Sequence, residues 1–441
     1  MKTLLVAALV AGFLVSNGQA ACPPEISLFK SPQTLGVLRT FALDLADVDS
    51  DGDNDVFVAS YHDNYFGPSQ LWLNNGDRTF SLSPESFPVS DVHGVAICDL
   101  NDDTYPDIFL ISQAGPSKVF FNDGTGSFVA GSQDIGTAAD LPFLLKMGDI
   151  DNDGDLDALM ACGVGIQLWL NDGTGIFALV NTLAAGRVGC ISLADVNGDR
   201  YLDLFIAFTD QPDEVWLNNG SGTFEYTGQA LGTATGYGYP VSGDIDGDGD
   251  IDFAVGNSVE GITIWLNQDN TGMFVNAGFC LEPGAYRAGL FDAEGDGDLD
   301  LISSHLTNGT KLWKNNGSAF FSLVGPISAS AGALCIGFGD LDDDSDNDVV
   351  FGYGETDGGN PVYFNETTRC CCVGVTGNVN MTGIVDLSDL SSLVSYLTGG
   401  GYVLPCNDEA NVNASGIVDL ADLSSLVSYL TGGGYVLSTC S

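Results

Sequence analysis

Residues Asp47 to Asp55 read D-V-D-S-D-G-D-N-D, and this nine-residue stretch decides the predicted fold. Carboxylates stand at positions 1, 3, 5, 7 and 9, and Gly52 at position 6 lets the backbone turn sharply. Ca²⁺ takes roughly six to eight oxygen ligands, which alternate carboxylates on a tight turn present together. The stretch therefore predicts a calcium-binding loop.

The nine-residue frame occurs seven times, and its first residues lie 46 to 52 positions apart. Each repeat also contains short apolar runs bounded by Gly, Asn and Asp turns. In the second repeat these runs are Gly94–Cys98, Ile108–Ile111, Val119–Asn122 and Ser127–Ala130. Such runs are typical of strands, and helical periodicity is absent. Four strands per repeat predict a propeller blade, so we expect a mainly β chain that forms a seven-bladed β-propeller.

The seventh repeat ends at residues 361–365 without the Gly-x-Phe strand that completes the other repeats. Residues 25–36 have the composition of an isolated fourth strand and its link. We therefore predict a propeller over residues 21–369 in which residues 25–36 close the last blade. Cys22 would then lie near Cys370-Cys371-Cys372, where a disulfide could lock the closure.

The first 20 residues have the features of a signal peptide. Lys2 precedes an apolar run from Leu4 to Val15, and Gly18-Gln19-Ala20 provides a small-residue cleavage site. The apolar run is too short to cross a bilayer, and no later stretch is long enough. We expect a secreted protein without a transmembrane segment; the alternative is an N-terminal membrane anchor.

The formal net charge is −47, from 12 basic and 59 acidic residues. Most of the acids cluster in the seven loops, which should repel one another without metal, so folding and calcium binding are expected to be linked. Nucleic acid is excluded as a partner because the basic footprint is missing. Disorder is excluded because 44% of residues are hydrophobic and fall in strand-like runs.

The loops, the strand after each loop and the following L-W-L-N-x-G-x-G-x-F segment resemble FG-GAP/VCBS repeats, which are related to the propeller of integrin α-subunits. The resemblance covers roughly residues 25–366. It implies a calcium site closed by position 9, with a backbone carbonyl ligand at position 7. The implied ligands are Asp47, Asp49, Asp51, Asp53, Asp55; Asp99, Asn101, Asp103, Tyr105, Asp107; Asp149, Asp151, Asp153, Asp155, Asp157; Asp195, Asn197, Asp199, Tyr201, Asp203; Asp244, Asp246, Asp248, Asp250, Asp252; Asp292, Glu294, Asp296, Asp298, Asp300; and Asp340, Asp342, Asp344, Asp346, Asp348.

Several loops depart from the repeat pattern. Position 3 is Asn101 in the second loop, Asn197 in the fourth and Glu294 in the sixth, and the second loop has Thr104 where glycine is expected. We expect the second loop to bind calcium most weakly.

A second module, residues 370–441, contains a duplication: residues 390–404 are repeated without change at 423–437. Each copy opens with a loop and continues into a helix with one apolar face, ended by glycines. The duplication resembles a dockerin domain, built from half-EF-hands, which docks secreted proteins onto cohesin modules. The implied calcium ligands are Asn378, Asn380, Thr382, Asp386, Asp389, Asn411, Asn413, Ser415, Asp419 and Asp422.

Each of these C-terminal loops offers only two carboxylates, so calcium should bind weakly, in the range of the weakest extracellular sites. The resemblance implies a cohesin-type scaffold protein as a partner. The alternative is a small, self-contained helical cap.

The rim opposite the loops is expected to carry the ligand site. Links that enter the first strand or leave the second strand of each blade meet there, and they hold all three histidines and several arginines and aromatic residues. We predict a cationic, aromatic-lined mouth on the propeller axis, suited to a glycan or to a carboxylate on a protein. The candidate residues are Arg39, His62, His93, Phe143, Arg187, Tyr237, Tyr239, Tyr286, Arg287 and His305. The alternative is a set of scattered rim residues with no common ligand.

An enzyme is the second hypothesis for function. Some secreted propellers are polysaccharide lyases, which need a His or Tyr base with a cation that neutralises the uronate. His62, His93 and Tyr286 are candidate bases. Paired carboxylates of a glycoside hydrolase cannot be distinguished, because most of the acids belong to the loops.

The propeller strands also contain cysteines that need no disulfide partner. Cys98, Cys190 and Cys335 lie in apolar first-strand runs. We expect them to be buried free thiols.

Overall fold

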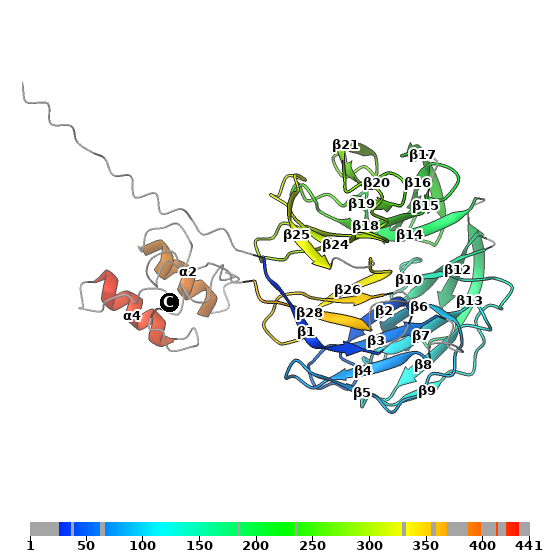
Figure 1. Cartoon of the computed structure of the whole chain (residues 1–441), viewed down its shortest axis with the longest axis horizontal. Coiled ribbons are helices and arrows are strands. Elements are labelled where there is room, and N and C mark those ends of the chain that lie inside the picture. Colours follow the sequence, from blue (N-terminus) through cyan, green and yellow to red (C-terminus); the bar gives the residue numbers. More distant parts are fainter. Residues whose placement is uncertain are drawn as a thin grey trace, which may run out of the picture. The chain divides into compact units, whose positions relative to one another are not determined.

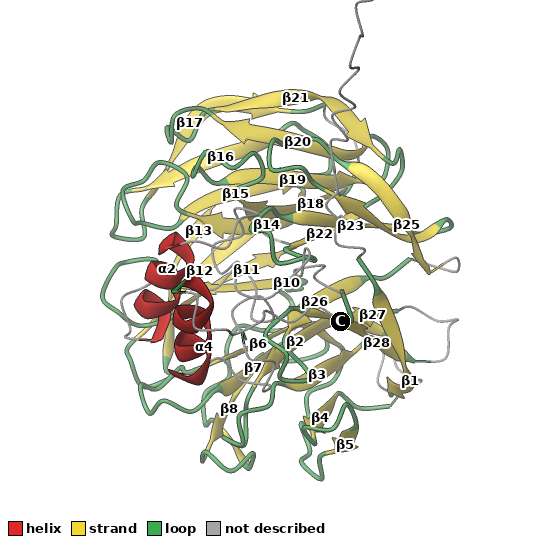
Figure 2. Ribbon diagram, turned by 90° about the vertical axis from the view of Figure 1, so that its left-hand side faces the viewer, coloured by secondary structure: helices red, strands yellow, loops and turns green. Residues whose placement is uncertain are grey.

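The computed structural model describes residues 26–36, 39–61, 67–163, 165–183, 186–233, 236–328, 332–353, 359–367, 387–397, 412 and 420–431. The chain divides into two units: Ile26–Thr367, and the residues that lie before and after it. In the described residues the first unit is all β, with seven four-stranded antiparallel sheets (Figures 1 and 2). The predicted seven-bladed propeller is confirmed.

Each sheet is one blade, numbered 1 to 7 along the chain. Blades 1 to 4 are, in order, β2 (Thr40–Ala46), β3 (Asp55–Ser60), β4 (Gln70–Asn74), β5 (Phe80–Leu82); β6 (Val92–Cys98), β7 (Asp107–Ser112), β8 (Lys118–Asn122), β9 (Phe128–Ala130); β10 (Leu144–Gly148), β11 (Asp157–Cys162), β12 (Gly165–Asn171), β13 (Phe177–Leu183); and β14 (Val188–Ala194), β15 (Asp203–Phe208), β16 (Asp213–Asn218), β17 (Phe224–Leu231). Blades 5 to 7 are β18 (Gly238–Gly243), β19 (Asp252–Asn257), β20 (Gly261–Asn267), β21 (Phe274–Leu281); β22 (Arg287–Phe291), β23 (Asp300–His305), β24 (Gly309–Lys314), β25 (Ser322–Ser328); and β26 (Cys335–Gly339), β27 (Asp348–Gly352), β28 (Asn360–Asn365), β1 (Leu28–Leu35).

The seventh blade takes its outer strand from the start of the propeller. Strand β1 pairs antiparallel with β28, with Leu28 opposite Asn365 and Leu35 opposite Asn360, and Figure 1 shows the two side by side. The first strands of neighbouring blades contact one another, including β2 with β26, so the ring closes. The disulfide predicted between Cys22 and residues 370–372 lies outside the described residues.

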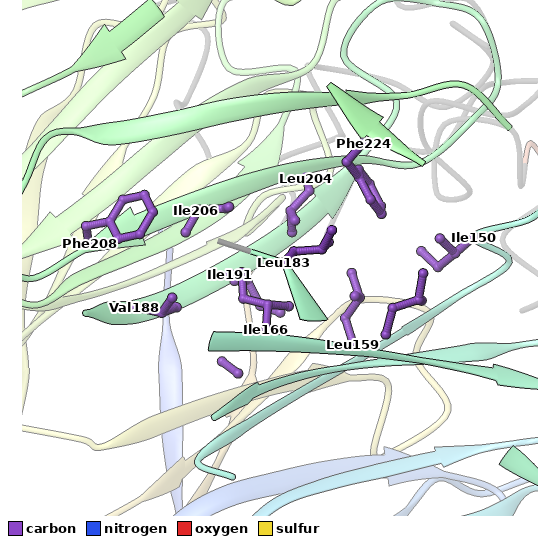
Figure 3. Close-up of a cluster of buried hydrophobic side chains, with 12 residues drawn as sticks. Ile150, Leu159, Ile166, Leu183, Val188, Ile191, Leu204, Ile206, Phe208 and Phe224 are labelled. Atoms are coloured by element: carbon purple, nitrogen blue, oxygen red, sulfur yellow. The ribbon is translucent and has the colours of Figure 1, made fainter. Parts of the chain in front are cut away.

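The hydrophobic core is divided into seven clusters, one between each pair of neighbouring blades. Figure 3 shows the cluster between blades 3 and 4, where Leu159 and Ile166 face Ile191 and Leu204. The second strands are buried on both faces, because a neighbouring blade covers each side; all six residues of β7 are buried. This explains why the second-strand sequences are continuously apolar rather than alternating.

Seven buried asparagines, each the last residue of a third strand or the residue directly after it, connect neighbouring blades by hydrogen bonds. In blade 3, Asn171 Nδ2 donates hydrogen bonds to the Leu100 carbonyl of blade 2 (2.9 Å) and to the Leu156 carbonyl of its own blade (3.3 Å). The other cross-blade bonds, of 2.7 to 3.0 Å, run from Asn74 to Leu341, Asn122 to Val48, Asn218 to Ile150, Asn267 to Val196, Asn315 to Ile245 and Asn365 to Ala293. Because Asn74 reaches back to blade 7, the series is continuous around the ring.

The free-thiol prediction is confirmed for Cys98, Cys190 and Cys335. Cys190 is buried as expected, whereas Cys98 and Cys335 are only half-buried. Cys335 is accessible because it faces the central cavity described below.

In the second unit the structure describes two helices, α2 (Leu387–Leu397) and α4 (Leu420–Leu430). They contact each other, and Leu393 and Leu426 are fully buried. Of the predicted calcium ligands, Asn378, Asn380, Thr382, Asp386, Asn411, Asn413, Ser415 and Asp419 lie outside the described residues, whereas Asp389 and Asp422 fall within the two helices. Among the described helices, none has the length and apolarity needed to cross a membrane.

The asparagine series generates a stability prediction. Replacing Asn171 with alanine removes the side-chain amide that donates to the Leu100 and Leu156 carbonyls. Both buried carbonyls then lose this hydrogen bond. An unsatisfied buried group costs about 1–3 kcal/mol, so the free energy of unfolding should fall by about that amount. Denaturant titration measures the change.

The matched control is Asn181→Ala in the same blade, whose exposed side chain accepts a hydrogen bond from the neighbouring Thr182 N–H. It should leave stability nearly unchanged. Equal effects of the two substitutions would contradict the role assigned to Asn171.

Candidate functional site

The seven acidic loops, residues 47–55, 99–107, 149–157, 195–203, 244–252, 292–300 and 340–348, are here numbered 1 to 7 and connect the first and second strands of each blade. The first aspartate of each loop organises the turn. In loop 3, Asp149 accepts hydrogen bonds from the Asp153 N–H (3.1 Å) and the Gly154 N–H (3.2 Å). The carboxylate thus closes the turn on itself and holds the following acids in place.

Position 6 of the loops has a left-handed backbone whether or not it is glycine. Gly52 and Gly154 have φ of +102° and +103°, while Thr104, Arg200 and Ser345 have φ of +76°, +74° and +69°. The missing glycine is therefore not confined to loop 2, because loops 4 and 7 also lack it. These three residues adopt a conformation that side chains disfavour, and the closed turn holds it.

Position 9 is a buried aspartate in every loop, and its carboxylate bonds to the backbone in two places. Asp157 Oδ2 accepts from the Ile150 N–H (3.0 Å), and Oδ1 accepts from the Asn171 N–H (2.9 Å). The same two bonds are made by Asp55, Asp107, Asp203, Asp252, Asp300 and Asp348. These side chains thus have a structural function in addition to the metal-binding one predicted for them.

In loops 1, 3, 5 and 7, three carboxylates converge so that one oxygen from each lies within 4.8 Å of the others. The groups are Asp47, Asp49 and Asp55; Asp149, Asp151 and Asp157; Asp244, Asp246 and Asp248; and Asp340, Asp342 and Asp344. One buried oxygen each of Asp49, Asp151 and Asp246 has no hydrogen-bond donor among the described residues. Carboxylates this close repel one another, and a hard cation placed between them removes that repulsion. These clusters can hold a metal ion.

The described residues of loops 2, 4 and 6 do not form such a group. Loops 2 and 4 have an amide at position 3, and Asn197 Nδ2 donates to Asp199 Oδ2 (2.9 Å). In loop 6, Glu294 pairs with Lys314 of β24.

At the other ends of the strands, the centre of the ring contains a cavity of about 600 Å³. Its wall includes residues from the first strand of every blade and from the segments that follow several second strands. Six of the ten predicted mouth residues line it together: His93, Phe143, Arg187, Tyr237, Tyr239 and Arg287. The structure therefore brings these six residues together at one cavity.

The other four predicted residues do not line the cavity or are not described. Arg39 does not line the cavity, and its guanidinium lies over the rings of Phe41 and Tyr61. The Tyr286 hydroxyl is buried and donates to the Ala333 carbonyl (2.7 Å), and burial raises its pKa. His305 accepts hydrogen bonds from the Thr307 and Asn308 N–H groups. His62 lies outside the described residues.

Several wall residues were not predicted, including Phe41, Tyr61, Lys146 and Cys335. Phe41 and His93 both stand six residues before their loops, so the repeat alignment contained a signal for Phe41. Lys146 stands only three residues before its loop, deeper in the first strand than the links considered. The structure was needed to show that the cavity extends that far.

The cavity wall has two aromatic groups. At blades 1 and 2, the rings of Phe41, Tyr61 and His93 pack against one another, with centroids 4.7 to 5.7 Å apart. At blades 5 and 6, the Arg287 guanidinium stacks on Tyr239, 3.6 Å from the ring centroid. Flat rings beside cations suit a ligand that has both an apolar face and negative charge.

The charge of the wall is opposite to that of the chain. Arg187, Arg287 and Lys146 line the cavity, and the described wall residues include no Asp or Glu. Neither arginine forms an ion pair within the described part of the chain, whereas Lys146 is attracted to Asp44, a neighbouring buried carboxyl whose pKa burial raises. Both guanidinium groups are therefore available to an anion that enters the cavity.

Comparison with known families supports the repeat assignment. Four overlapping segments, 47–110, 99–160, 149–206 and 195–255, match the FG-GAP-like repeat. Each match begins at the first aspartate of a loop. Residues 47–255 are therefore similar to FG-GAP-like repeats. A comparison with curated proteins gave no match.

Solved structures with similar folds include the BP39L lectin and BBS1N. The BP39L lectin from Burkholderia pseudomallei aligns with 12% identity over 74% of this chain and 96% of its own, with a TM-score of 0.57. BBS1N, solved in complex with ARL6DN, aligns with 13% identity over 78% and 98%, with a TM-score of 0.56. An N-acetylglucosamine-recognising lectin of Agrocybe aegerita has 20% identity over 69% and 81%, with a TM-score of 0.48. At these identities the likenesses to the BP39L lectin and to BBS1N show the fold alone.

The position-9 carboxyls generate a pH prediction. Burial raises the pKa of Asp55 and Asp348 to about 7 and that of Asp107, Asp157, Asp203 and Asp252 to about 6. In an unfolded chain these carboxyls titrate near 3.9. The folded state therefore binds their protons more tightly, and this contribution to stability is lost as pH rises from about 4 to about 7.

The expected result is that chelator-treated protein in metal-free buffer has a lower melting temperature at pH 8 than at pH 5. Circular dichroism during heating measures it, with the two samples at equal ionic strength. A melting temperature that stays constant or rises between pH 5 and pH 8 would contradict the prediction, because it would show that ionisation of the buried carboxyls does not lower the stability of the folded state.

Proposed function

We propose that this protein binds an acidic glycan in the central cavity of its propeller. The observation that supports the proposal is the inverted charge of the wall. A chain with 59 acidic and 12 basic residues has three of its cations at one cavity, and the described wall contains no carboxylate. Such a wall attracts a carboxylate or sulfate group at short range.

The shape of the cavity agrees with a sugar ligand. Its volume of about 600 Å³ lies within the usual range of small-molecule sites. The half-buried ring of Phe143 and the exposed ring of Tyr237 offer stacking surfaces for the apolar face of a sugar. Arg187 and Arg287 provide planar donors that match the two oxygens of a carboxylate.

We further propose that calcium occupies the acidic loops and that the protein is secreted. The converging carboxylates of loops 1, 3, 5 and 7 and the FG-GAP repeat match support calcium. The N-terminal sequence supports secretion.

Attachment to a cohesin-type scaffold through residues 370–441 is a third part of the proposal. It is supported by the exact duplication in the sequence and by the two paired helices α2 and α4. Pull-down against a panel of cohesin modules, with and without EDTA, tests it. Calcium-dependent capture would support docking, and capture by no cohesin would favour the self-contained helical cap.

Polysaccharide cleavage is the alternative function, with His93 as the candidate base within the wall. The ring of His93 packs against Phe41 and Tyr61. The Tyr286 hydroxyl donates a hydrogen bond to the Ala333 carbonyl. Neither observation favours proton abstraction over binding. Incubation with acidic polysaccharides distinguishes the two functions, because cleavage yields new chain ends and binding does not.

The binding proposal predicts that removing a cavity cation weakens binding. Hydrogen bonds to charged groups contribute about 1.5–3 kcal/mol, so Arg187→Ala or Arg287→Ala should each lower affinity for an acidic oligosaccharide about 10-fold or more. Isothermal titration with uronate-containing and sulfated oligosaccharides measures the change. A glycan array provides the starting ligand.

The matched control is Lys118→Ala, which removes a cation that pairs with Asp134 and does not line the cavity. It should leave affinity unchanged. Equal binding of neutral and acidic oligosaccharides, or unchanged affinity in both arginine variants, would contradict the proposal. Binding only of acidic proteins would reassign the cavity to a protein ligand.

A further inference from the structure

Blade 6 differs from the other blades at two positions that lie together. Position 3 of its loop is Glu294, where the other loops have Asp or Asn. The residue before the buried asparagine of its third strand is Lys314, where the other blades have Leu73, Phe121, Leu170, Leu217, Leu266 and Phe364. The register is the same in each blade: Trp313 pairs with Leu301 as Trp265 pairs with Phe253 in blade 5. The two differences are thus paired changes in one local structure.

The side chains of these two residues form an ion pair inside loop 6. Lys314 Nζ contacts Glu294 Oε1, and Asp296 Oδ2 lies 3.9 Å away. The ammonium is also attracted by Asp292. It therefore faces the acids at positions 1, 3 and 5 of the loop, which are the positions that converge in loops 5 and 7.

Glu294 depends on this contact for its charge balance. Its side chain is fully buried, whereas that of Lys314 is 29% exposed. A buried carboxylate without a counter-charge is strongly unfavourable, and the lysine supplies that charge from within the chain. The additional methylene of glutamate relative to aspartate extends the carboxylate towards the lysine.

A calcium ion and this ammonium would compete for the same carboxylates. Calcium requires several oxygens at about 2.3–2.6 Å, whereas an ammonium pairs with carboxylates at about 2.7–2.9 Å. Both cations together would repel each other at short range. The described acids of loop 6 do not converge on a common point as those of loops 1, 3, 5 and 7 do.

We propose that Lys314 is a tethered replacement for calcium, so that loop 6 keeps its shape without a metal ion. The inference rests on the proposed calcium binding by the other loops. It assigns blade 6 a permanent, calcium-independent connection, which would persist at calcium concentrations that empty the other sites.

Loop 7 provides a contrast, because it also contacts a cation. Arg78 from blade 1 pairs with Asp342 (2.7 Å) and with Glu366. The three acids Asp340, Asp342 and Asp344 nevertheless stay within 4.8 Å of one another. An ion pair at position 3 therefore does not by itself remove the metal geometry, and the inference is restricted to loop 6.

The test restores the pattern of the other blades in loop 6. The double variant Glu294→Asp/Lys314→Leu gives loop 6 the same residue types at these positions as loop 5. It should bind one more calcium ion per chain than the unchanged protein. Equilibrium dialysis followed by atomic emission counts the bound ions.

The reverse transplant guards against misfolding of the first variant. Asp246→Glu/Leu266→Lys places the blade 6 pair in blade 5 and should remove one bound calcium ion per chain. Lys118→Leu, which removes a surface cation away from the loops, should leave the count unchanged. A second readout is melting in chelator, where Lys314→Met should lower the melting temperature because Glu294 loses its counter-charge.

The outcomes separate this inference from the calcium proposal. No bound calcium in the unchanged protein would overturn the calcium proposal, and this inference with it. Bound calcium whose count changes in neither double variant would overturn this inference alone. A gain of one ion in the first variant together with a loss of one in the second would establish it.

Discussion

The fold depends on one repeated contact, the pairing of a buried aspartate with a buried asparagine at the base of each loop. The carboxylate of Asp157 fixes the start of its loop and the end of its third strand at the same time. The amide of Asn171 then reaches the preceding blade. Because each blade makes the same bonds, the network sets both the shape of every loop and the spacing between blades. Contacts within the chain therefore define the position of every acidic loop.

The carboxylates of the acidic loops repel one another, and two features of the structure oppose this repulsion. The core between blades is extensive, with seven apolar clusters, and it holds the ring against the mutual repulsion of the loops. Local counter-charges act where acids are buried, as with Lys314 beside Glu294 and Arg78 beside Asp342. For the converging carboxylates of loops 1, 3, 5 and 7, we propose that bound calcium ions neutralise the repulsion.

Much of the propeller could be predicted because its information is local and repeated. The loop at Asp47 and the apolar runs around it specify a blade, and the absence of a last strand in the seventh repeat indicated where β1 pairs. Contacts between blades could not be predicted in this way. Nothing in the sequence near Asn171 indicates that its amide bonds to Leu100, and the pairing of Glu294 with Lys314 requires the strand register. Likewise, Lys146 lies deep in a strand, and only the ring arrangement places it in the cavity.

The acidic loops and the cationic cavity lie at opposite ends of the propeller strands, so the charge of the loops acts on a ligand that approaches the cavity. The loops join the ends of the first strands to the second strands, and the cavity opens among the opposite strand ends. At physiological salt, charges more than about 8 Å apart are largely screened, so the short-range contacts of Arg187 and Arg287 govern the capture of an anion. At lower ionic strength, where screening is weaker, the net charge of −47 slows the approach of an anionic ligand. With calcium in the loops as proposed, that field weakens, so metal loading should act on the association rate more than on the contacts within the cavity.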